Sequence, residues 1–223
     1  MNLTIIAATG RIGRLLVDQA LAAGHELTVI ARHPEGFRSD VRVVQVDLLR
    51  PDRPVLASAI HGADAVLSGL GPGSRREFGI AAKGTRPIVE AMKDTGVRRI
   101  VAVSAAPVST TASPGRPNPP RHDSGEGAVM QNLLTPAIKA LLRAHYADLA
   151  VMEDILRESG LDWTVVRPPQ LRDKPLTGTY RTALDRNLRR GTSVSRADVA
   201  HLMLAALERP ETIGHAVGIA SSQ

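Results

Sequence analysis

The sequence has no cysteine among its 223 residues, few aromatic side chains and no long apolar run. The absence of cysteine excludes disulfides, thiolate nucleophiles and cysteine-based zinc sites, and it fits a cytoplasmic protein. No apolar stretch approaches the length of a membrane span, and the N-terminus lacks the pattern of a signal peptide, so we expect no membrane partner. The seven histidines are scattered without a His-x-x-x-His spacing, so we expect no metal site.

Basic residues outnumber acidic ones and give a formal net charge of +6. They do not form a dense run, and aromatic residues make up only 2% of the chain, which leaves few surfaces for stacking on bases. We therefore expect no nucleic-acid partner. The positive charge is better suited to attracting an anionic small molecule, or it simply solvates the surface.

The most informative segment is the turn that follows the first apolar run. Residues 3–7 have the pattern of a strand, and residues 7–13, Ala-Ala-Thr-Gly-Arg-Ile-Gly, lead directly into an amphipathic run that ends at Ala23. A strand, a tight turn and a helix in this order leave backbone N–H groups at a helix N-terminus, which suits a pyrophosphate. The usual fingerprint begins with glycine where this chain has Ala7, so a tight turn that binds nothing stays the alternative.

The residue at the end of the second strand bears on the choice of dinucleotide. Residues 27–31 form that strand, and Arg32 follows it about 20 residues after the glycines. A carboxylate at this position would bond the ribose hydroxyls of NAD, whereas an arginine suits the 2′-phosphate of NADP. A solvated charge in a surface loop is the alternative for Arg32.

Strands and helices alternate along the rest of the chain. We expect further strands at 41–46, 64–68, 99–104, 162–166, 180–184 and 215–220, and helices at 81–95, at 136–159 and from a capping box at 195–198 to Leu207. The near-continuous apolar strands indicate a sheet buried on both faces. We therefore predict an α/β fold with a doubly wound parallel sheet of Rossmann type, as a single domain over residues 1–223 with a small C-terminal extension.

The segment 107–135 breaks this alternation. It is rich in proline, glycine and serine and has no apolar period before Val129. The segment leaves the fifth strand at the edge where such sheets bind ligands, which favours a lid over the site. A surface insertion without a role in binding is the alternative.

Four segments together resemble a known family. They are 7–13, the Gly-Val-Arg-Arg-Ile-Val run of 96–101, the Ser-Gly-Leu-Asp-Trp-Thr-Val-Val-Arg-Pro run of 159–168, and Asp-Lys-Pro-Leu-Thr-Gly-Thr-Tyr at 173–180. These motifs resemble the atypical short-chain dehydrogenases/reductases, which bind NAD(P)H, and the C-terminal ones resemble the biliverdin-IXβ reductase/flavin reductase family. The resemblance covers nearly the whole chain except about 110 to 145.

The resemblance implies an NADPH-dependent reductase of planar conjugated acceptors such as flavins, quinones or linear tetrapyrroles, and our leading hypothesis adds polyketide-like acceptors. The residues that it implies for the cofactor are Thr9, Gly10, Arg11, Ile12 and Gly13 along the pyrophosphate, Arg32 at the 2′-phosphate, Asp47 and Leu48 at the adenine, Leu70, Gly71 and Ser104 near the middle and the nicotinamide, and Pro168 and Pro169 in the nicotinamide pocket. Pro107, Gln170 and Leu171 follow strands at the same edge and are candidates for binding the acceptor. We expect a monomer or a homodimer.

The chain departs from the family pattern at four positions. Ser104 is followed by Ala105 where the family has a Thr-Ser pair, Gln170 replaces a histidine, and Gly36 replaces an arginine near the 2′-phosphate. Tyr146 is not followed four residues later by the lysine of the usual Tyr-x-x-x-Lys pair, which favours a packed helix residue over a catalytic acid.

Ser104 is therefore the remaining candidate catalytic side chain. The missing acid/base groups favour acceptors that delocalise charge and take a proton from water. The alternatives are an NAD(P)-sensing regulator of the nitrogen-metabolite-repressor type, which the same losses would suit, and an epimerase or dehydratase, which Arg32 and the missing lysine disfavour.

Overall fold

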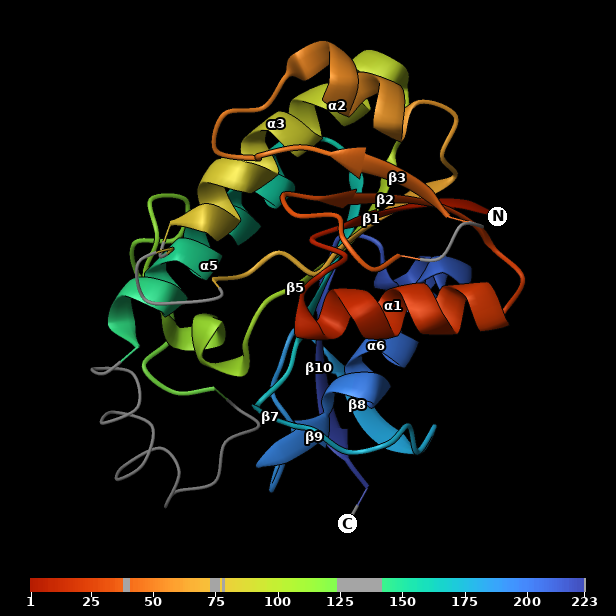
Figure 1. The fold of residues 1–223 in the computed structure, drawn as a ribbon. Coiled ribbons are helices and arrows are strands. Elements are labelled where there is room, and N and C mark those ends of the chain that lie inside the picture. The colour runs from red at the N-terminus through yellow and green to blue at the C-terminus, as the bar shows by residue number, and fades with distance from the viewer. Residues whose placement is uncertain (38–40, 73–76, 78, 124–141, 223) are drawn as a thin grey trace.

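One eight-stranded sheet runs through the whole molecule. The structure is a computed structural model that describes residues 1–37, 41–72, 77, 79–123 and 142–222. The strands lie in the order β3-β2-β1-β4-β5-β6-β10-β8 (Figure 1). Their bounds are β1 (Asn2–Ile6), β2 (Glu26–Ala31), β3 (Arg42–Gln45), β4 (Ala65–Ser68), β5 (Arg99–Val103), β6 (Asp162–Arg167), β8 (Tyr180–Leu184) and β10 (His215–Ser221).

All neighbouring strands of this sheet run parallel except β8, which pairs antiparallel with β10. The strand order reverses between β1 and β4, as in doubly wound folds, so the predicted fold class is confirmed. The antiparallel edge strand β8 corrects the expectation of a wholly parallel sheet. A single edge strand of this kind is common on otherwise parallel sheets.

Helices cover both faces of the sheet. Their bounds are α1 (Arg11–Ala22), α2 (Arg53–Ile60), α3 (Ile80–Thr95), α5 (Arg143–Glu158) and α6 (Arg196–Ala205), with shorter 3₁₀ turns η2 (Ala106–Thr110), η4 (Ala206–Glu208) and η5 (Pro210–Thr212). Helices α1 and α6 lie together on one face, and α2, α3 and α5 lie on the other (Figure 1).

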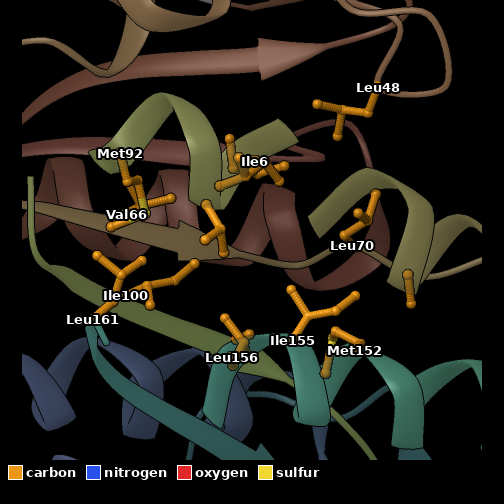
Figure 2. Close-up of a cluster of buried hydrophobic side chains, with 14 of the residues drawn as sticks. Ile6, Leu48, Val66, Leu70, Met92, Ile100, Met152, Ile155, Leu156 and Leu161 are labelled. Carbon is orange, nitrogen blue, oxygen red and sulfur yellow. The ribbon is translucent and has the colours of Figure 1, made fainter. Parts of the chain in front are cut away.

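The strands supply both cores because successive side chains point to opposite faces. Ile6 and Ile100 belong to the cluster under α2, α3 and α5 (Figure 2), while their neighbours Ile5 and Val101 belong to the cluster under α1 and α6. This two-sided burial explains why the strands read as continuous apolar runs rather than as an alternation. Both hydrophobic clusters therefore pack on the same sheet, which joins them in one domain.

Local signals at the helix ends agree with the prediction. Gly96 ends α3 with a left-handed φ of 76°, and the Ser195 hydroxyl accepts a hydrogen bond from the Asp198 N–H at 2.8 Å at the start of α6. Helix α5 starts at Arg143, and residues 136–141 of the predicted helix lie outside the described residues.

Apart from the 3₁₀ turns, three elements of the described structure were not predicted. They are α2 and two short strands, β7 (Gln170–Arg172) and β9 (Ser193–Ser195), which pair parallel in a small separate sheet. Three residues are too few to show a strand period, so only the pairing of distant segments reveals β7 and β9.

The described part of the Pro-rich segment packs against the domain. After η2, Ser113 and Arg116 form an isolated antiparallel bridge, and the Gly115 N–H donates to Asp154 Oδ2 of α5 at 2.9 Å. Residues 124–135 of the segment lie outside the described residues. The role of this segment as a lid stays a prediction.

The described ranges contain neither a membrane-spanning helix nor a cluster of metal-binding side chains. No helix there is long and apolar enough to cross a membrane. No group of three or more histidine, aspartate or glutamate side chains in those ranges could hold a metal ion.

Candidate functional site

The predicted cofactor residues meet at one edge of the sheet. Strands β1 to β6 are parallel, so the residues that follow them gather at the same side. Thr9 to Gly13 follow β1, Arg32 follows β2, Asp47 and Leu48 follow β3, Leu70 and Gly71 follow β4, Ser104 follows β5, and Pro168 and Pro169 follow β6.

The turn after β1 is tightly built. Ala7, at the position where the fingerprint has glycine, adopts a left-handed φ of 57°, and its carbonyl accepts from the Gly10 N–H at 2.9 Å. A Cβ on Gly13 would lie 2.2 Å from that same carbonyl oxygen, and a Cβ on Gly69 would lie 3.3 Å from the Gly13 nitrogen. Helix α1 therefore starts in direct contact with the ends of β1 and β4, and only glycine permits this approach at position 13.

The start of α1 is suited to an anion. No side chain caps the helix, and its first turn contains no acidic residue. The first N–H groups of a helix have no partner within it, and they lie at the positive end of its dipole. Beside them, the Asp173 carboxylate pairs with Arg11, the first residue of α1, and with Arg196 Nη1 at 2.7 Å. The Asp173 carboxylate thus joins Arg196 of α6 to the first residue of α1.

Arg32 lies at the edge of the sheet with its charge already paired. Its Nη2 lies 2.7 Å from Glu77 Oε1, and its carbonyl accepts from Gln45 Nε2 at 3.0 Å. The hydrogen bond and charge of Glu77 raise the pKa of Arg32. A phosphate at this position would therefore compete with Glu77 for the same guanidinium.

The side chains of Leu48 and Leu70 are part of the core rather than free to meet a ligand. Both are buried in the cluster shown in Figure 2, and both approach Gly84 of α3. A Cβ at Gly84 would lie 2.6 Å from Leu70 Cδ2. By contrast, Gly71 is exposed and has open space around it, so a ligand can approach its backbone.

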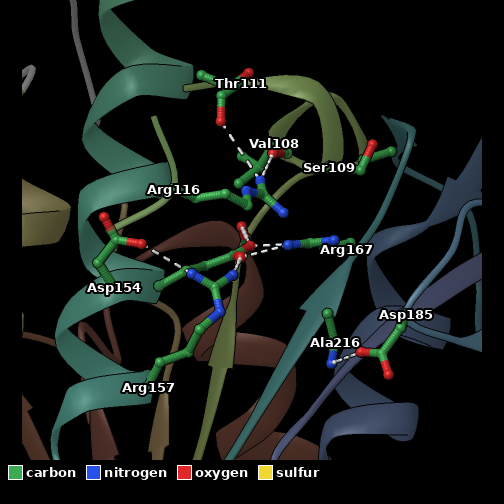
Figure 3. Close-up of polar contacts among 12 residues, drawn as sticks. Val108, Ser109, Thr111, Arg116, Asp154, Arg157, Arg167, Asp185 and Ala216 are labelled. Carbon is green, nitrogen blue, oxygen red and sulfur yellow. Dashed lines mark hydrogen bonds and ion pairs between the residues drawn. The ribbon is translucent and has the colours of Figure 1, made fainter. Parts of the chain in front are cut away.

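Ser104 is buried at the end of β5, and its hydroxyl donates to Glu153 Oε1 of α5 at 2.7 Å. Glu153 is fully buried and also accepts hydrogen bonds from Arg167 (Figure 3). The distance from Arg167 Nε to Glu153 Oε1 is 2.9 Å. Burial alone would raise the pKa of Glu153, but the hydrogen bonds and charge of Arg167 outweigh it and hold that pKa below its usual value. Glu153 is therefore ionised.

This pairing decides what Ser104 offers a ligand. A serine hydroxyl has a single proton and two acceptor positions. Because the hydroxyl proton points to the Glu153 carboxylate, the Ser104 oxygen keeps its lone pairs for a further donor. A ligand that reached this oxygen would therefore meet a hydrogen-bond acceptor.

Sequence reasoning missed the charged cluster behind Ser104. Glu153 and Asp154 stand on α5, Arg167 ends β6, and Arg157 pairs with both carboxylates. One signal was present: Glu153 and Arg157 are four residues apart on a helix face that is otherwise apolar. Arg167 lies in a motif that carried the family resemblance, but its partner is on another element.

Tyr146 has its side chain in the apolar cluster on the α5 side of the sheet. Burial raises the pKa of its hydroxyl, and Ala150 occupies the position of the missing lysine. A buried phenol with a raised pKa is poorly suited to exchange protons with a substrate.

The candidate acceptor residues come from neighbouring strands. Pro107 lies in η2 after β5, and the adjacent Ala106 N–H donates to the Pro168 carbonyl at 2.9 Å. Gln170 is exposed at the start of β7, whereas Leu171 is half-buried against the cluster under α1 and α6. The structure thus brings Pro107 close to the segment that continues to Gln170.

Comparison with known proteins gives a consistent result. The model of a family described as NAD(P)H-binding matches residues 7–210. The uncharacterised sugar epimerase YhfK of Bacillus subtilis is 30% identical over 220 residues, which cover 95% of this chain and 90% of YhfK.

Solved structures share the fold over the full length. SP1627 of Streptococcus pneumoniae TIGR4, a candidate NADH-flavin reductase, is 23% identical with a TM-score of 0.74 and covers 100% of both chains. ChuY, an anaerobillin reductase of Escherichia coli O157:H7, is 20% identical with a TM-score of 0.74, and the match covers 100% of this chain and 98% of ChuY.

Proposed function

Because the chain belongs to the NAD(P)H-binding family, we propose that it is an NADPH-dependent reductase that passes hydride to a planar conjugated acceptor. The acceptor class comprises flavins, quinones, tetrapyrroles and polyketide-like molecules. When bound, the cofactor supplies the hydride from its nicotinamide ring, and the protein supplies binding, orientation and exclusion of water.

The hydrogen bond that the Ser104 hydroxyl donates to Glu153 is the observation that carries this proposal. A simple ketone develops alkoxide charge during reduction and needs a donor beside its oxygen. At this edge the Ser104 hydroxyl donates its hydrogen bond to Glu153, Tyr146 is in the core, and Gln170 is not an acid. A conjugated acceptor spreads the charge and takes its proton from water, so it suits a site of this kind.

The names of the two structural neighbours support the same class by analogy, since one is called a flavin reductase and the other an anaerobillin reductase. The name of YhfK, a sugar epimerase, does not favour that reaction here. Such enzymes use NAD as their cofactor, and Arg32 disfavours NAD binding. Tyr146 also lacks the neighbouring lysine that would activate its hydroxyl.

In the proposed complex the turn of Thr9 to Gly13 holds the pyrophosphate and Arg32 holds the 2′-phosphate. Asp47 and the backbone of Leu48 flank the adenine, and the backbone at Leu70 and Gly71 flanks the middle of the cofactor. Ser104 accepts from the nicotinamide carboxamide, and Pro168 and Pro169 line its pocket. Pro107, Gln170 and Leu171 contact the acceptor. We also propose a cytoplasmic monomer or homodimer.

The test is an NADPH-oxidation assay with FMN, riboflavin, menadione and biliverdin as acceptors, and cyclohexanone as the control ketone. NADH is assayed in parallel. We expect NADPH oxidation with at least one conjugated acceptor and none with the ketone. Tight NADPH binding without oxidation by any acceptor would instead indicate an NAD(P)-sensing regulator.

A further inference from the structure

Two arginines that are predicted to hold the phosphates of the cofactor are already paired with carboxylates from distant segments. Arg32 Nη2 lies 2.7 Å from an oxygen of Glu77, which stands 45 positions later in the chain, after β4. Arg11, the first residue of α1, pairs with Asp173, which stands 162 positions later, directly after β7. Each carboxylate therefore occupies a guanidinium that a phosphate group would need.

Both pairs are open to solvent. The side chains of Arg11 and Asp173 are 64% and 63% exposed, and those of Arg32 and Glu77 are 49% and 26% exposed. Exposed ion pairs are weak, because water and dissolved salt screen them. A charge-assisted hydrogen bond to a phosphate is stronger, so a bound cofactor can displace either carboxylate. Breaking the pair is then a small cost that is charged against cofactor binding.

Asp173 has a second cation that keeps it in place. Arg196 Nη1, on the first residue of α6, lies 2.7 Å from Asp173 Oδ1, and the Arg196 side chain is only 15% exposed. Burial and the positive charge of Arg11 both lower the pKa of Arg196. One carboxylate thus serves two guanidinium groups. Asp173 can release Arg11 to a phosphate and still keep Arg196 as its counter-charge.

We propose that Glu77 and Asp173 determine the affinity and the specificity of the cofactor site, because each competes with one phosphate group of the cofactor for an arginine. Asp173 competes with the pyrophosphate, which NADPH and NADH share, and so lowers the affinity for both. Glu77 competes with the 2′-phosphate, which NADH lacks, and so narrows the preference for NADPH. This inference rests on the cofactor binding of the proposed function and adds two residues that weaken it.

Neutral variants of the two carboxylates should give different patterns. The probes are NADP⁺ and NAD⁺, and equilibrium dialysis at low ionic strength, where ion pairs are least screened, gives their dissociation constants. We expect Glu77→Gln to bind NADP⁺ about twofold to fivefold more tightly and NAD⁺ as before. Asp173→Asn should bind both dinucleotides more tightly by a similar factor. Only the first variant should therefore change the ratio of the two constants.

Two control variants make the same changes at the opposite edge of the sheet. Glu26→Gln lies at the start of β2, the strand that ends beside Arg32, and Asp162→Asn lies at the start of β6. Both alter the net charge exactly as the test variants do. Neither should change a dissociation constant, because both positions lie at the far ends of parallel strands from the cofactor edge.

A double variant shows whether Glu77 acts through Arg32. In an Arg32→Ala background, Glu77→Gln should no longer change the affinity for NADP⁺, because the two substitutions remove the same ion pair. An undiminished effect in that background would overturn competition for the guanidinium. Weaker binding of NAD⁺ by Glu77→Gln would make Glu77 a ligand of the ribose and would also overturn its role as a competitor.

The competing role for both carboxylates is purely structural, as ties between distant segments. In that case the variants lose stability in urea while the dissociation constants stay at the wild-type values. Unchanged or weaker binding of NADP⁺ by either variant therefore overturns the proposed role of that residue. Stronger binding with the expected difference between the two variants supports it.

The same measurement separates this inference from the proposed reductase function. Dialysis with oxidised dinucleotides needs no acceptor and no turnover, so the expected pattern can hold in a protein that reduces none of the acceptors. Oxidation of NADPH by the wild type, combined with dissociation constants that neither substitution lowers, would overturn the inference and leave the reductase function standing. Failure of the wild type and both variants to bind either dinucleotide would overturn both.

Discussion

At the scale of single residues, the partner of each polar group decides what it offers a ligand. Arg32 pairs with Glu77, and the Ser104 hydroxyl donates its hydrogen bond to Glu153. Residue type alone says that an arginine binds phosphate and that a serine donates or accepts. The observed partners refine both expectations: a phosphate would compete with Glu77 for Arg32, and a ligand at Ser104 would meet a hydrogen-bond acceptor.

Arg32→Ala is expected to weaken NADPH binding by one to two decades, because a charge-assisted contact is worth about 1.5–3 kcal/mol. NADH, which lacks the 2′-phosphate, should bind with unchanged affinity. Fluorescence titration of both cofactors gives the two dissociation constants. Arg42→Ala, an exposed arginine at the other edge, serves as the control. Equal affinities of the wild type for NADPH and NADH would contradict the role of Arg32.

Ser104→Ala is expected to lower kcat by only about twofold to tenfold, the cost of one hydrogen bond of about 0.5–1.5 kcal/mol. The reason is that its hydroxyl donates to the Glu153 carboxylate and not to the acceptor, so we expect no proton transfer to be lost. Steady-state kinetics with the best acceptor, together with NADPH titration, measure this. A loss of about a hundredfold or more with unchanged NADPH affinity would show that the hydroxyl is the proton donor after all.

At the scale of elements, the turn between β1 and α1 holds a strained residue. Ala7 has a φ of 57°, a conformation that costs an L-residue roughly 1–2 kcal/mol and costs glycine almost nothing. Ala7→Gly should therefore raise the free energy of unfolding by about 0.5–1 kcal/mol, after the added flexibility of the unfolded chain is subtracted. Urea denaturation measures it. Ala8→Gly, next to it and fully buried, should destabilise instead; stabilisation by both or by neither would refute the strain at Ala7.

The pairing of α5 with β6 through Glu153 and Arg167 makes stability depend on pH. The pKa of Glu153 is lowered from its usual value of 4.5 in the folded protein, so the contribution is complete above that value and is lost as the pH falls through the folded pKa. Glu153→Gln should cost about 3–5 kcal/mol near neutral pH, because it leaves a buried arginine without its counter-charge.

The gap in unfolding free energy between wild type and Glu153→Gln should narrow as the pH falls below about 4.5. Urea denaturation across the acid range tests this. Asp162→Asn is the control, because the Arg98–Asp162 ion pair is largely exposed, and such pairs contribute about 1 kcal/mol or less. A gap that stays constant with pH would show that the cost comes from packing and not from the charge.

At the scale of the whole molecule, cofactor binding is linked to unfolding. A ligand at 100 times its dissociation constant stabilises the folded state by about 2.7 kcal/mol, which in a chain of this size raises Tm by roughly 5–10 °C. NADPH should give this shift, and NADH at the same concentration should give less. In Arg32→Ala the two shifts should become equal. Identical shifts in the wild type would contradict the proposed preference for NADPH.

The architecture could be predicted because its signals are local. Strands β1, β4 and β5 consist mainly of apolar residues, and a run of this kind indicates burial on both faces without knowledge of any partner. The turn at residues 7–13 and the helix end at Gly96 could likewise be predicted, because each depends on residues that are adjacent in the sequence. The short strand β7 was missed because three residues carry no period.

The sequence by itself determined the fold class, the edge of the sheet at which the candidate residues gather and the residue types present there, because chain order and local pattern dictate which residues follow each parallel strand. The tertiary structure alone decided the partners of those residues. Ser104 meets Glu153 across 49 positions, and Arg11 meets Asp173 across 162. Long charged side chains have many potential partners, and only the packing of distant elements selects one and sets the protonation state that follows.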